Sequence, residues 1–195
     1  MQTRKLVLVA SLLLFLNPAL LAADTYTMDV ANSMVGFSVR HMLINNVRGN
    51  FRDFSGTISY DPQDVTKSSV EVHIRSKSID TGNEDRDNHL RSADFFDVEK
   101  FPEITFKSNR IEKNGDSYIL RGPLTMHGIS KEVAIPFSIS GTVKDPRGGT
   151  HLGAEASLTI SRKDFGLTWN RTLEGGGVLV SDEVKIELGV EATRQ

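Results

Sequence analysis

The stretch VGFSVRH, residues 35–41, decides the fold class because its side chains alternate in character. Val35, Phe37 and Val39 lie on one side of an extended chain, whereas small and charged residues lie on the other. A period of two is that of a β-strand with one buried and one solvent-facing side. His41 continues the apolar side and is expected to point inward at the end of this strand.

The same period recurs over most of the chain after residue 23. Predicted strands occupy 70–75, 133–139, 154–160 and 184–190, with shorter ones at 103–113 and 117–126. Turn signals separate them, among them Asp61-Pro62, Asn114-Gly115 and the glycines at 175–177. A single domain made of many antiparallel strands needs a sandwich or a closed barrel to cover its edges. The period alone leaves both architectures open.

One polar segment, 81–93, lacks the alternation and predicts a short helix near residues 83–90. The helix would start near Asn83, with Glu84 and Asp85 in its first turn, where negative charge is favourable.

The N-terminal segment, residues 1–23, has the pattern of a cleaved secretory signal. Arg4 and Lys5 precede an apolar run at 6–16, and the small residues Ala22 and Ala23 follow. The run is too short and too interrupted for a membrane-spanning helix. We expect cleavage after Ala22 or Ala23, export to the periplasm, and one domain over residues 24–195 that does not span the membrane.

Composition and motifs exclude several classes of function. The chain has no cysteine, and therefore no disulfide and no acylated cysteine as an anchor. Its 23 basic and 25 acidic residues form no basic run, so no nucleic-acid partner is expected. The five histidines show no spacing typical of zinc ligands, and no nucleophile motif is present. We predict no metal site, no catalytic residue and no enzyme activity.

The segment RDNHLRSADFF, residues 86–96, places several charges directly before Phe95 and Phe96. It could be acid/base machinery beside an apolar pocket, or a polar clamp that holds a lid over one. A solvated connection with weak surface ion pairs is a third interpretation. His41 is equally open: it could be an ordinary core histidine, or a polar group at the mouth of an apolar cavity.

Several stretches of the chain resemble the YceI-like family of exported bacterial lipid-binding proteins. They are VGFSVRHM (35–42), VRGNFRDFSGTISYD (47–61), SIDTGNEDRDNHLRSADFFDVEKFPEITFKS (78–108), LTMHGISKEV (124–133), RKDFGL (162–167) and DEVKIEL (182–188). The long central stretch is the most specific of them. Many relatives have His-Leu-Gly where this chain has His41-Met42-Leu43, and this departure affects how the chain leaves the strand.

The resemblance implies an all-β fold, an extended antiparallel lipocalin-like β-barrel with the short helix near 83–90. It implies a central tunnel that holds a long polyisoprenoid, a role in transport, storage or stress response, no cofactor other than this lipid, and a homodimer as one assembly state. The candidate apolar ligand-binding residues are Phe37, Val39, Val72, Ile74, Phe95, Phe96, Phe106, Leu124, Ile135, Phe137, Leu158, Phe165, Trp169 and Ile186. The candidate polar residues, for ligand contact or for the clamp, are His41, Arg86, Asp87 and His89.

Four functions are compatible with this pattern. The leading one is a carrier of a long-chain isoprenoid such as a quinone or prenyl lipid. The second is a fatty acid or fatty amide carrier, with His41 or Arg86 at the head group. The third is an enzyme that uses His89 and Asp87 as an acid/base pair, and the fourth is a structural envelope module with a solid core.

Overall fold

The computed structural model describes residues 23–195, so the predicted signal segment lies almost entirely outside the described residues. The strands are β1 (Asp24–Met28), β2 (Met34–His41), β3 (Asn45–Phe51), β4 (Phe54–Tyr60), β5 (Ser69–Arg75), β6 (Ile79–Asp80), β7 (Glu103–Lys107), β8 (Arg110–Asn114), β9 (Ser117–Met126), β10 (Ile129–Lys144), β11 (Thr150–Ser161) and β12 (Val180–Arg194). The helical segments are α1 (Glu84–Arg91) and three short 3₁₀ turns, η1 (Val65–Lys67), η2 (Ser76–Ser78) and η3 (Arg162–Phe165).

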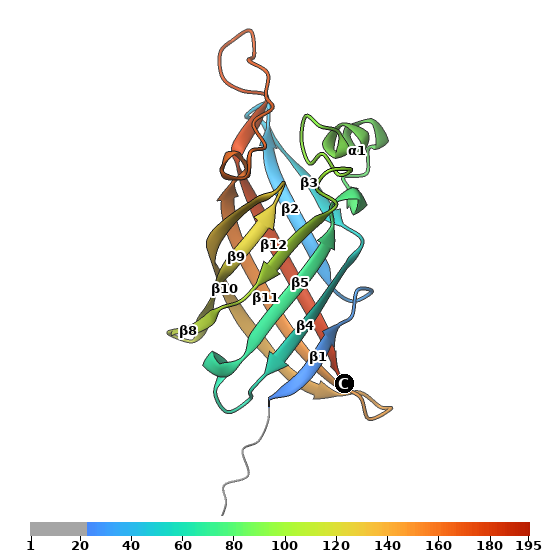
Figure 1. Ribbon diagram of the computed structural model, residues 1–195, viewed down its shortest axis with the longest axis vertical. Coiled ribbons are helices and arrows are strands. Elements are labelled where there is room, and N and C mark those ends of the chain that lie inside the picture. The colour runs from blue at the N-terminus through green and yellow to red at the C-terminus, as the bar shows by residue number, and fades with distance from the viewer. Residues whose placement is uncertain (1–22) are drawn as a thin grey trace, which may run out of the picture.

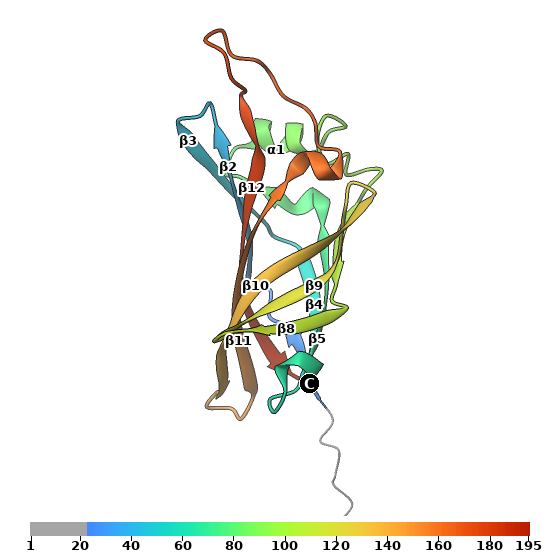
Figure 2. The same cartoon turned by 90° about the vertical axis from the view of Figure 1, so that its left-hand side faces the viewer.

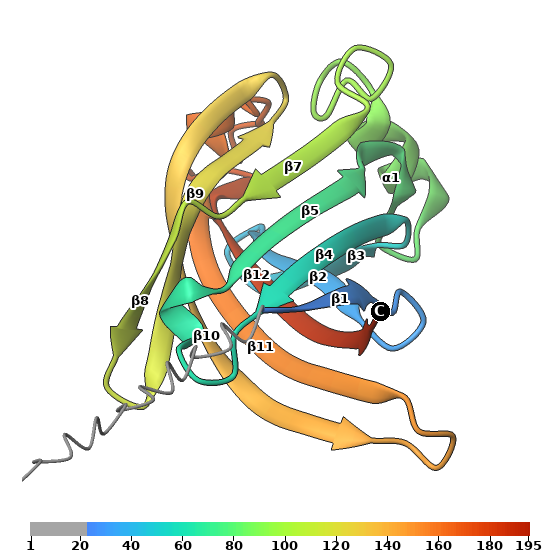
Figure 3. The ribbon, with the colours of Figure 1, turned by 60° about the horizontal axis from the view of Figure 1, so that its bottom comes forward.

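The strands form one antiparallel sheet that closes on itself. Within residues 23–195 the closed ring has eight strands and runs β1-β4-β5-β7-β9-β10-β11-β12, with β12 returning to β1. Figure 3 shows β1 filling the space between β4 and the end of β12. The predicted all-β barrel is therefore confirmed, and the sandwich that the period also allowed is excluded.

Strand β12 pairs with two strands, β1 and β2, along the same edge. Its C-terminal end pairs with β1, where Ala192 lies opposite Met28. Its N-terminal half pairs with β2, where Ile186 lies opposite Phe37. The wall therefore extends beyond β1 through β2, β3 and β6 (Figure 1). We call the end that carries α1 the upper end and the end that carries β1 and the C-terminus the lower end.

The alternation read from the sequence sets which side chains face the interior. Along β10, Ile135 is buried whereas its neighbours Ala134 and Pro136 are exposed. Three clusters of buried side chains fill the barrel wall and its ends. The upper cluster contains Phe51, Ile79, Ile104, Met126, Phe165 and Leu167; the lower contains Tyr26, Met28, Ile58, Leu152 and Ala192; the third contains Phe106, Ile111, Leu120 and Ile135.

The connections follow the local chemistry of the sequence. Asn83 caps α1, because its side chain accepts a hydrogen bond from the backbone N–H of Arg86 at 2.9 Å, and the helix predicted near 83–90 is confirmed. The turn between β8 and β9 contains Gly115 at φ 61°. The β2–β3 turn places Met42 and Leu43 at φ 51° and 63°. L side chains rarely adopt this conformation.

No helix among residues 23–195 is both long enough and apolar enough to cross a bilayer.

Candidate functional site

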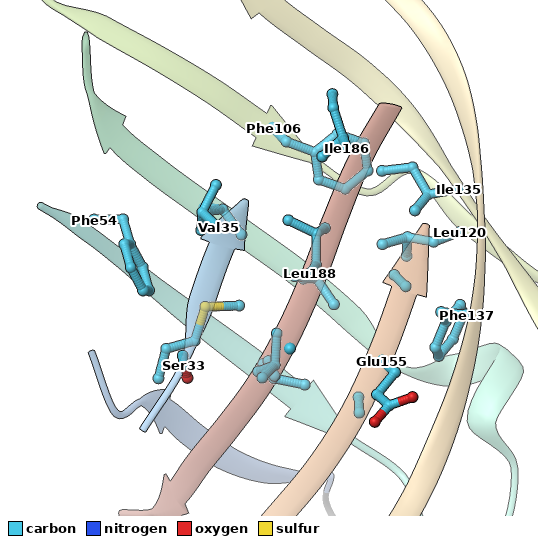
Figure 4. A pocket seen from close by; sticks show the side chains of 18 of the residues that line it. Ser33, Val35, Phe54, Phe106, Leu120, Ile135, Phe137, Glu155, Ile186 and Leu188 are labelled. Atoms are coloured by element: carbon cyan, nitrogen blue, oxygen red, sulfur yellow. The ribbon is translucent and has the colours of Figure 1, made fainter. Parts of the chain in front are cut away.

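An elongated apolar cavity of about 190 Å³ lies inside the barrel. Side chains from all eight strands of the ring line it, and apart from glycines they are apolar at all but four positions, Ser33, Tyr60, Ser68 and Glu155. Figure 4 shows Ile186 and Leu188 of β12 beside Ile135 of β10 and Leu120 of β9, strands that lie beyond β11 in the ring. Such a lining favours an apolar ligand over a charged one.

The register of three neighbouring strands builds one wall of this cavity. Ile186 of β12 lies opposite Phe37 of β2 on one side and Leu158 of β11 on the other. Residues directly opposite in an antiparallel pair point to the same face, so the three side chains form one apolar row across the wall. Leu188 repeats the arrangement one step further along the strand, between Val35 and Ala156.

The hydroxyl groups of the two lining serines are bonded to the backbone. Ser33 Oγ donates to the carbonyl of Glu191 at 3.0 Å and accepts from its N–H at 2.9 Å. Ser68 Oγ accepts from the N–H of Asp61 at 3.0 Å. These side chains therefore fix loops at the lower end instead of contributing polarity to the cavity.

Tyr60 brings a phenol to the lower part of the cavity, where its ring meets the edge of Tyr26 with centroids 6.1 Å apart. Burial raises the pKa of Tyr60 above its ordinary value, and the nearby Tyr118, Tyr26 and Asp61 raise it further. The hydroxyl is therefore neutral at physiological pH and can donate a hydrogen bond to a polar atom of a ligand.

At the upper part of the cavity, a glycine makes room for an aromatic ring. Phe37 lies over Gly49, and a Cβ at that position would come within 2.5 Å of Phe37 Cζ and 2.8 Å of Thr81 Cγ2. Only glycine permits this packing. Thr81 also belongs to the connection that holds α1, so the cavity wall and the lid meet at this point.

The lid consists of α1 and the residues that follow it, up to Phe96. Asp87 is buried, and its Oδ1 accepts from both the backbone N–H and the hydroxyl of Thr81, at 2.9 and 2.5 Å. Arg86 donates from Nε to Thr81 Oγ1 at 2.7 Å and from Nη2 to the Thr81 carbonyl at 3.0 Å. Arg86 and Asp87 thus tie α1 to Thr81 from two sides.

Arg91 is a third anchor of the lid that the sequence interpretation did not single out. Its guanidinium donates to the carbonyls of Lys77 at 2.9 Å and Ile79 at 2.8 Å. It lies within the charged segment 86–96, and that charge density is the signal that could have indicated it. Below it, Phe96 packs edge-on against the cavity residue Phe51, with centroids 5.8 Å apart.

His89 belongs to a different contact from Arg86 and Asp87. Its Nε2 lies 2.9 Å from Asp94 Oδ2, and its ring packs edge-on against Phe95 and Trp169 at 5.1 and 4.8 Å. In the described chain no hydrogen bond or ion pair joins His89 to Asp87, so the acid/base pair considered from the sequence does not form. His89 instead connects the lid to the segment after η3.

That segment is held in turn by Arg162, a buried arginine that sequence reasoning missed. Its guanidinium donates to the carbonyls of Leu167, Trp169 and Ser181, the latter two at 2.9 Å. It also lies 3.4 Å from Asp182. Burial lowers the pKa of Arg162, and Asp182 opposes this shift. The residue occurs in RKDFGL, but nothing in the sequence pattern distinguishes it from an exposed arginine.

Nine of the predicted ligand-binding residues lie in the cavity lining. They are Phe37, Val72, Ile74, Phe106, Leu124, Ile135, Phe137, Leu158 and Ile186. Five lie elsewhere: Val39 on the part of β2 above the cavity, Phe165 in the upper core, and Phe95, Phe96 and Trp169 in or beside the lid. The four polar candidates, His41, Arg86, Asp87 and His89, also lie outside the lining.

The sequence analysis missed the contribution of β1 and β4 to the cavity. Met28, Phe54, Ile58 and Tyr60 all line it. Phe54, Ile58 and Tyr60 do share the period of two, but Gly56 interrupts the apolar series. That glycine accommodates Met28, whose Sδ would lie 2.5 Å from a Cβ at this position.

Among residues 23–195, no three histidine, aspartate or glutamate side chains are grouped to hold a metal ion. The chemistry that the described site offers is that of an apolar cavity with a neutral phenol at one end.

A model of the YceI-like domain matches residues 26–192. The chain belongs to the YceI-like family. A relative from Salmonella newport, named protein YceI, is 36% identical over 187 residues, which cover 96% of this chain and 95% of the relative. The crystal structure of BcnA from Burkholderia cenocepacia superimposes with a TM-score of 0.75 at 25% identity, over 84% of this chain and 98% of that one.

A second solved structure, described as a polyisoprenoid binding domain from Saccharophagus degradans, has a TM-score of 0.65 over 87% of this chain and 98% of that one. Its identity of 16% shows likeness of fold alone.

Proposed function

We propose that this protein is an exported carrier or storage protein that holds an isoprenoid lipid, such as a quinone or prenyl lipid, inside the barrel. The observation that carries the proposal is the cavity, whose lining is apolar at all but four positions apart from glycines. The domain of like fold from Saccharophagus degradans, described as polyisoprenoid binding, supports the same ligand class. Residues 1–23 would direct export to the periplasm, and residues 24–195 would form the mature carrier.

The energetics favour such a ligand. Each CH₂ group transferred from water to an apolar site contributes about 0.8 kcal/mol. A long tail would therefore exceed any observed affinity many times over, because binding free energies saturate near about −20 kcal/mol. The volume that the barrel offers, and not the hydrophobicity of the tail, would then select chain length.

The volume of the cavity limits which lipids can bind without a rearrangement of its lining. A dry cavity of about 150 Å³ holds one benzene molecule in another protein, and this cavity encloses about 190 Å³. A long polyisoprenoid would therefore require the lining to rearrange. Phe37, Phe106 and Phe137 are among the bulky lining groups whose rotation would create space.

The small volume also favours a second candidate, a single-chain fatty acid or fatty amide. Tyr60 would be the donor to its head group, because His41 and Arg86 lie outside the lining.

Native mass spectrometry of the mature protein from its own host, followed by solvent extraction, tests both candidates. We expect an added mass that releases an isoprenoid, and a released fatty acid would identify the second candidate instead. Leu188→Trp, which fills the cavity, should abolish the added mass, whereas Val143→Trp on the exposed β10–β11 hairpin should retain it. A bare wild-type protein that stays bare after incubation with prenyl lipids would contradict the carrier function.

A further inference from the structure

Two loops at the upper end expose large apolar side chains side by side. Met42, Leu43 and Ile44 of the β2–β3 turn are 42%, 54% and 78% exposed, and Val178 of the 171–179 loop is 39% exposed. The N–H of Met42 donates to the carbonyl of Leu179 at 2.8 Å, and a Cβ on Gly177 would lie 3.2 Å from Leu43 Cδ1. We call these four side chains the apolar tip.

The apolar tip is convex and lies at the extremity of the molecule. In Figures 1 and 2, the 171–179 loop projects beyond the rim of the barrel, and the β2–β3 turn rises next to it. A projecting tip cannot enclose a partner's helix or peptide, as a groove would. It can enter a soft, deformable apolar phase.

The backbone conformation at the tip is unfavourable for the residues whose side chains it exposes. Met42 and Leu43 both have positive φ, a conformation that glycine or asparagine adopts more easily. Strain of this kind persists mainly where a function requires the side chain. A turn that served only to connect β2 and β3 would be more stable with glycine there.

The charges beside the tip complement an anionic surface. Arg40 donates from Nε to the carbonyl of Leu43 at 3.1 Å, and Arg171 lies 5.7 Å from the ring centroid of Trp169. Within residues 23–195 neither arginine has a carboxylate within ion-pair distance. Glu174 is the one carboxylate in the two loops and offsets Arg171, so the net positive charge beside the tip comes from Arg40 of β2. Arginine and tryptophan behind an apolar tip are the residue types that suit the headgroup layer.

We propose that the apolar tip docks the protein on the surface of an anionic lipid bilayer. In this orientation α1 and the rest of the lid face the membrane, because they occupy the same end of the barrel (Figure 2). The proposal goes beyond the carrier function and does not depend on it. A protein that binds vesicles without carrying lipid, or the reverse, would separate the two.

Co-sedimentation with vesicles tests the proposal. We expect the mature protein to bind vesicles of phosphatidylcholine mixed with phosphatidylglycerol more tightly than vesicles of phosphatidylcholine alone. The double variant Leu43→Ser, Ile44→Ser should bind at least about tenfold more weakly, because two apolar side chains no longer enter the bilayer. The matched control is Val30→Ser, Val143→Ser, which removes two exposed apolar side chains at the lower end and should bind as the wild type does.

Charge variants test the second half of the argument. Arg171→Gln should weaken binding to the anionic vesicles about fivefold, and Glu174→Gln should tighten it about fivefold, since each change alters the local charge by one. Both effects should shrink as salt is added. Charge variants with no effect at low salt would overturn the electrostatic part of the proposal.

Leu43→Gly separates docking from folding. We expect weaker vesicle binding together with an unchanged or higher melting temperature, because glycine relieves the backbone strain. A lower melting temperature with unchanged binding would show that Leu43 only supports the turn, and would overturn the proposal. The proposal would also be overturned by a wild-type protein that does not sediment with vesicles, or by equal losses of vesicle binding in the tip and control variants. A tip variant that loses only self-association, measured by analytical ultracentrifugation, would overturn it as well.

Discussion

The two ends of the barrel are closed by different means. The lower end is closed by backbone hydrogen bonds. Strand β1 pairs with both β12 and β4, and the N–H of Gln195 donates to the carbonyl of Thr25. At the upper end side chains take this role, since Asp87 and Arg162 bond to the backbone of Thr81 and Trp169 in loops, and Arg91 bonds to the carbonyl of Ile79 in the short strand β6. A ladder depends little on the identity of any one side chain. A closure made by a few buried polar side chains depends strongly on each.

This difference explains where the protein can open. The cavity is coupled to the lid through few groups, because Phe37 and Thr81 both lie next to Gly49, and Thr81 also bonds Asp87. Loss of one bond at the upper end therefore frees a segment next to the ligand space. At the lower end, β1 must leave two strands at once. We expect ligand exchange at the upper end.

Arg162→Met should produce the largest effect, because it removes the charged donor shared by four carbonyl groups, those of Leu167, Trp169, Val180 and Ser181. We expect a loss of about 3–5 kcal/mol in the free energy of unfolding, since buried carbonyl acceptors lose their charged donor. Urea denaturation measures it. The matched control is Arg171→Gln, an exposed arginine of the same segment, for which the change should stay within about 0.5 kcal/mol. A loss below about 1 kcal/mol for Arg162→Met would show that water replaces the guanidinium.

The contrast between the ends also explains what the sequence could reveal. The strands were predictable from the period of two, as in Val133, Ile135 and Phe137, but this period left both a sandwich and a closed barrel open. The barrel, and the inward direction of the apolar faces, came from the family resemblance. Nine lining residues were named for the same reason. The side-chain closure of the upper end was not predictable in this way, because no period relates Arg162 to the carbonyls of Trp169 and Ser181.

The charged segment 81–96 was only partly predictable from the sequence. Its helix followed from the cap at Asn83, and its dense charges suggested a clamp formed by Arg86, Asp87 and His89. The structure divides this set: Arg86 and Asp87 meet at Thr81, whereas His89 contacts Asp94 and two aromatic rings. Spacing along a helix shows which residues share a face. It does not show which segments the rest of the fold brings against that face.

Asp87→Ala should give the next largest effect. It leaves the N–H and hydroxyl of Thr81 without their acceptor in a buried position, at a cost of about 1–3 kcal/mol. Hydrogen exchange should accelerate over residues 79–96 and not in β10 to β12. Asp85→Ala, on the exposed side of the same first turn, controls for the helix dipole and should change stability by less than about 1 kcal/mol. Uniform acceleration over the whole barrel would contradict a lid that opens separately.

The smallest effect is expected at the lower end, from pH. His151 Nε2 lies 3.0 Å from Asp145 and its Nδ1 lies 3.1 Å from Glu191. The hydrogen bond to Asp145 raises the pKa of His151 above its ordinary 6.5, and Glu191 adds to the shift. Because the pKa of His151 is higher in the folded than in the unfolded protein, protonated His151 stabilises the fold. This contribution is fully present below the pKa of the unfolded state and is lost as the pH rises through the pKa of the folded state.

The melting temperature should therefore fall slightly between weakly acid and weakly alkaline pH. His151→Gln should reduce that slope, whereas His41→Gln, which changes a histidine outside this cluster, should retain it.

In stronger acid the melting temperature should fall as the pH is lowered, because the pKa of Asp145 is lowered by the hydrogen bond from His151 and by the backbone N–H groups of Arg147 and Gly149. Its contribution is present above the ordinary carboxyl pKa and is lost as the pH falls through the lowered one. The cluster is largely open to water, so both changes should remain below those of Arg162→Met and Asp87→Ala. A pH effect as large as either would mean that the lower end, too, depends on single side chains.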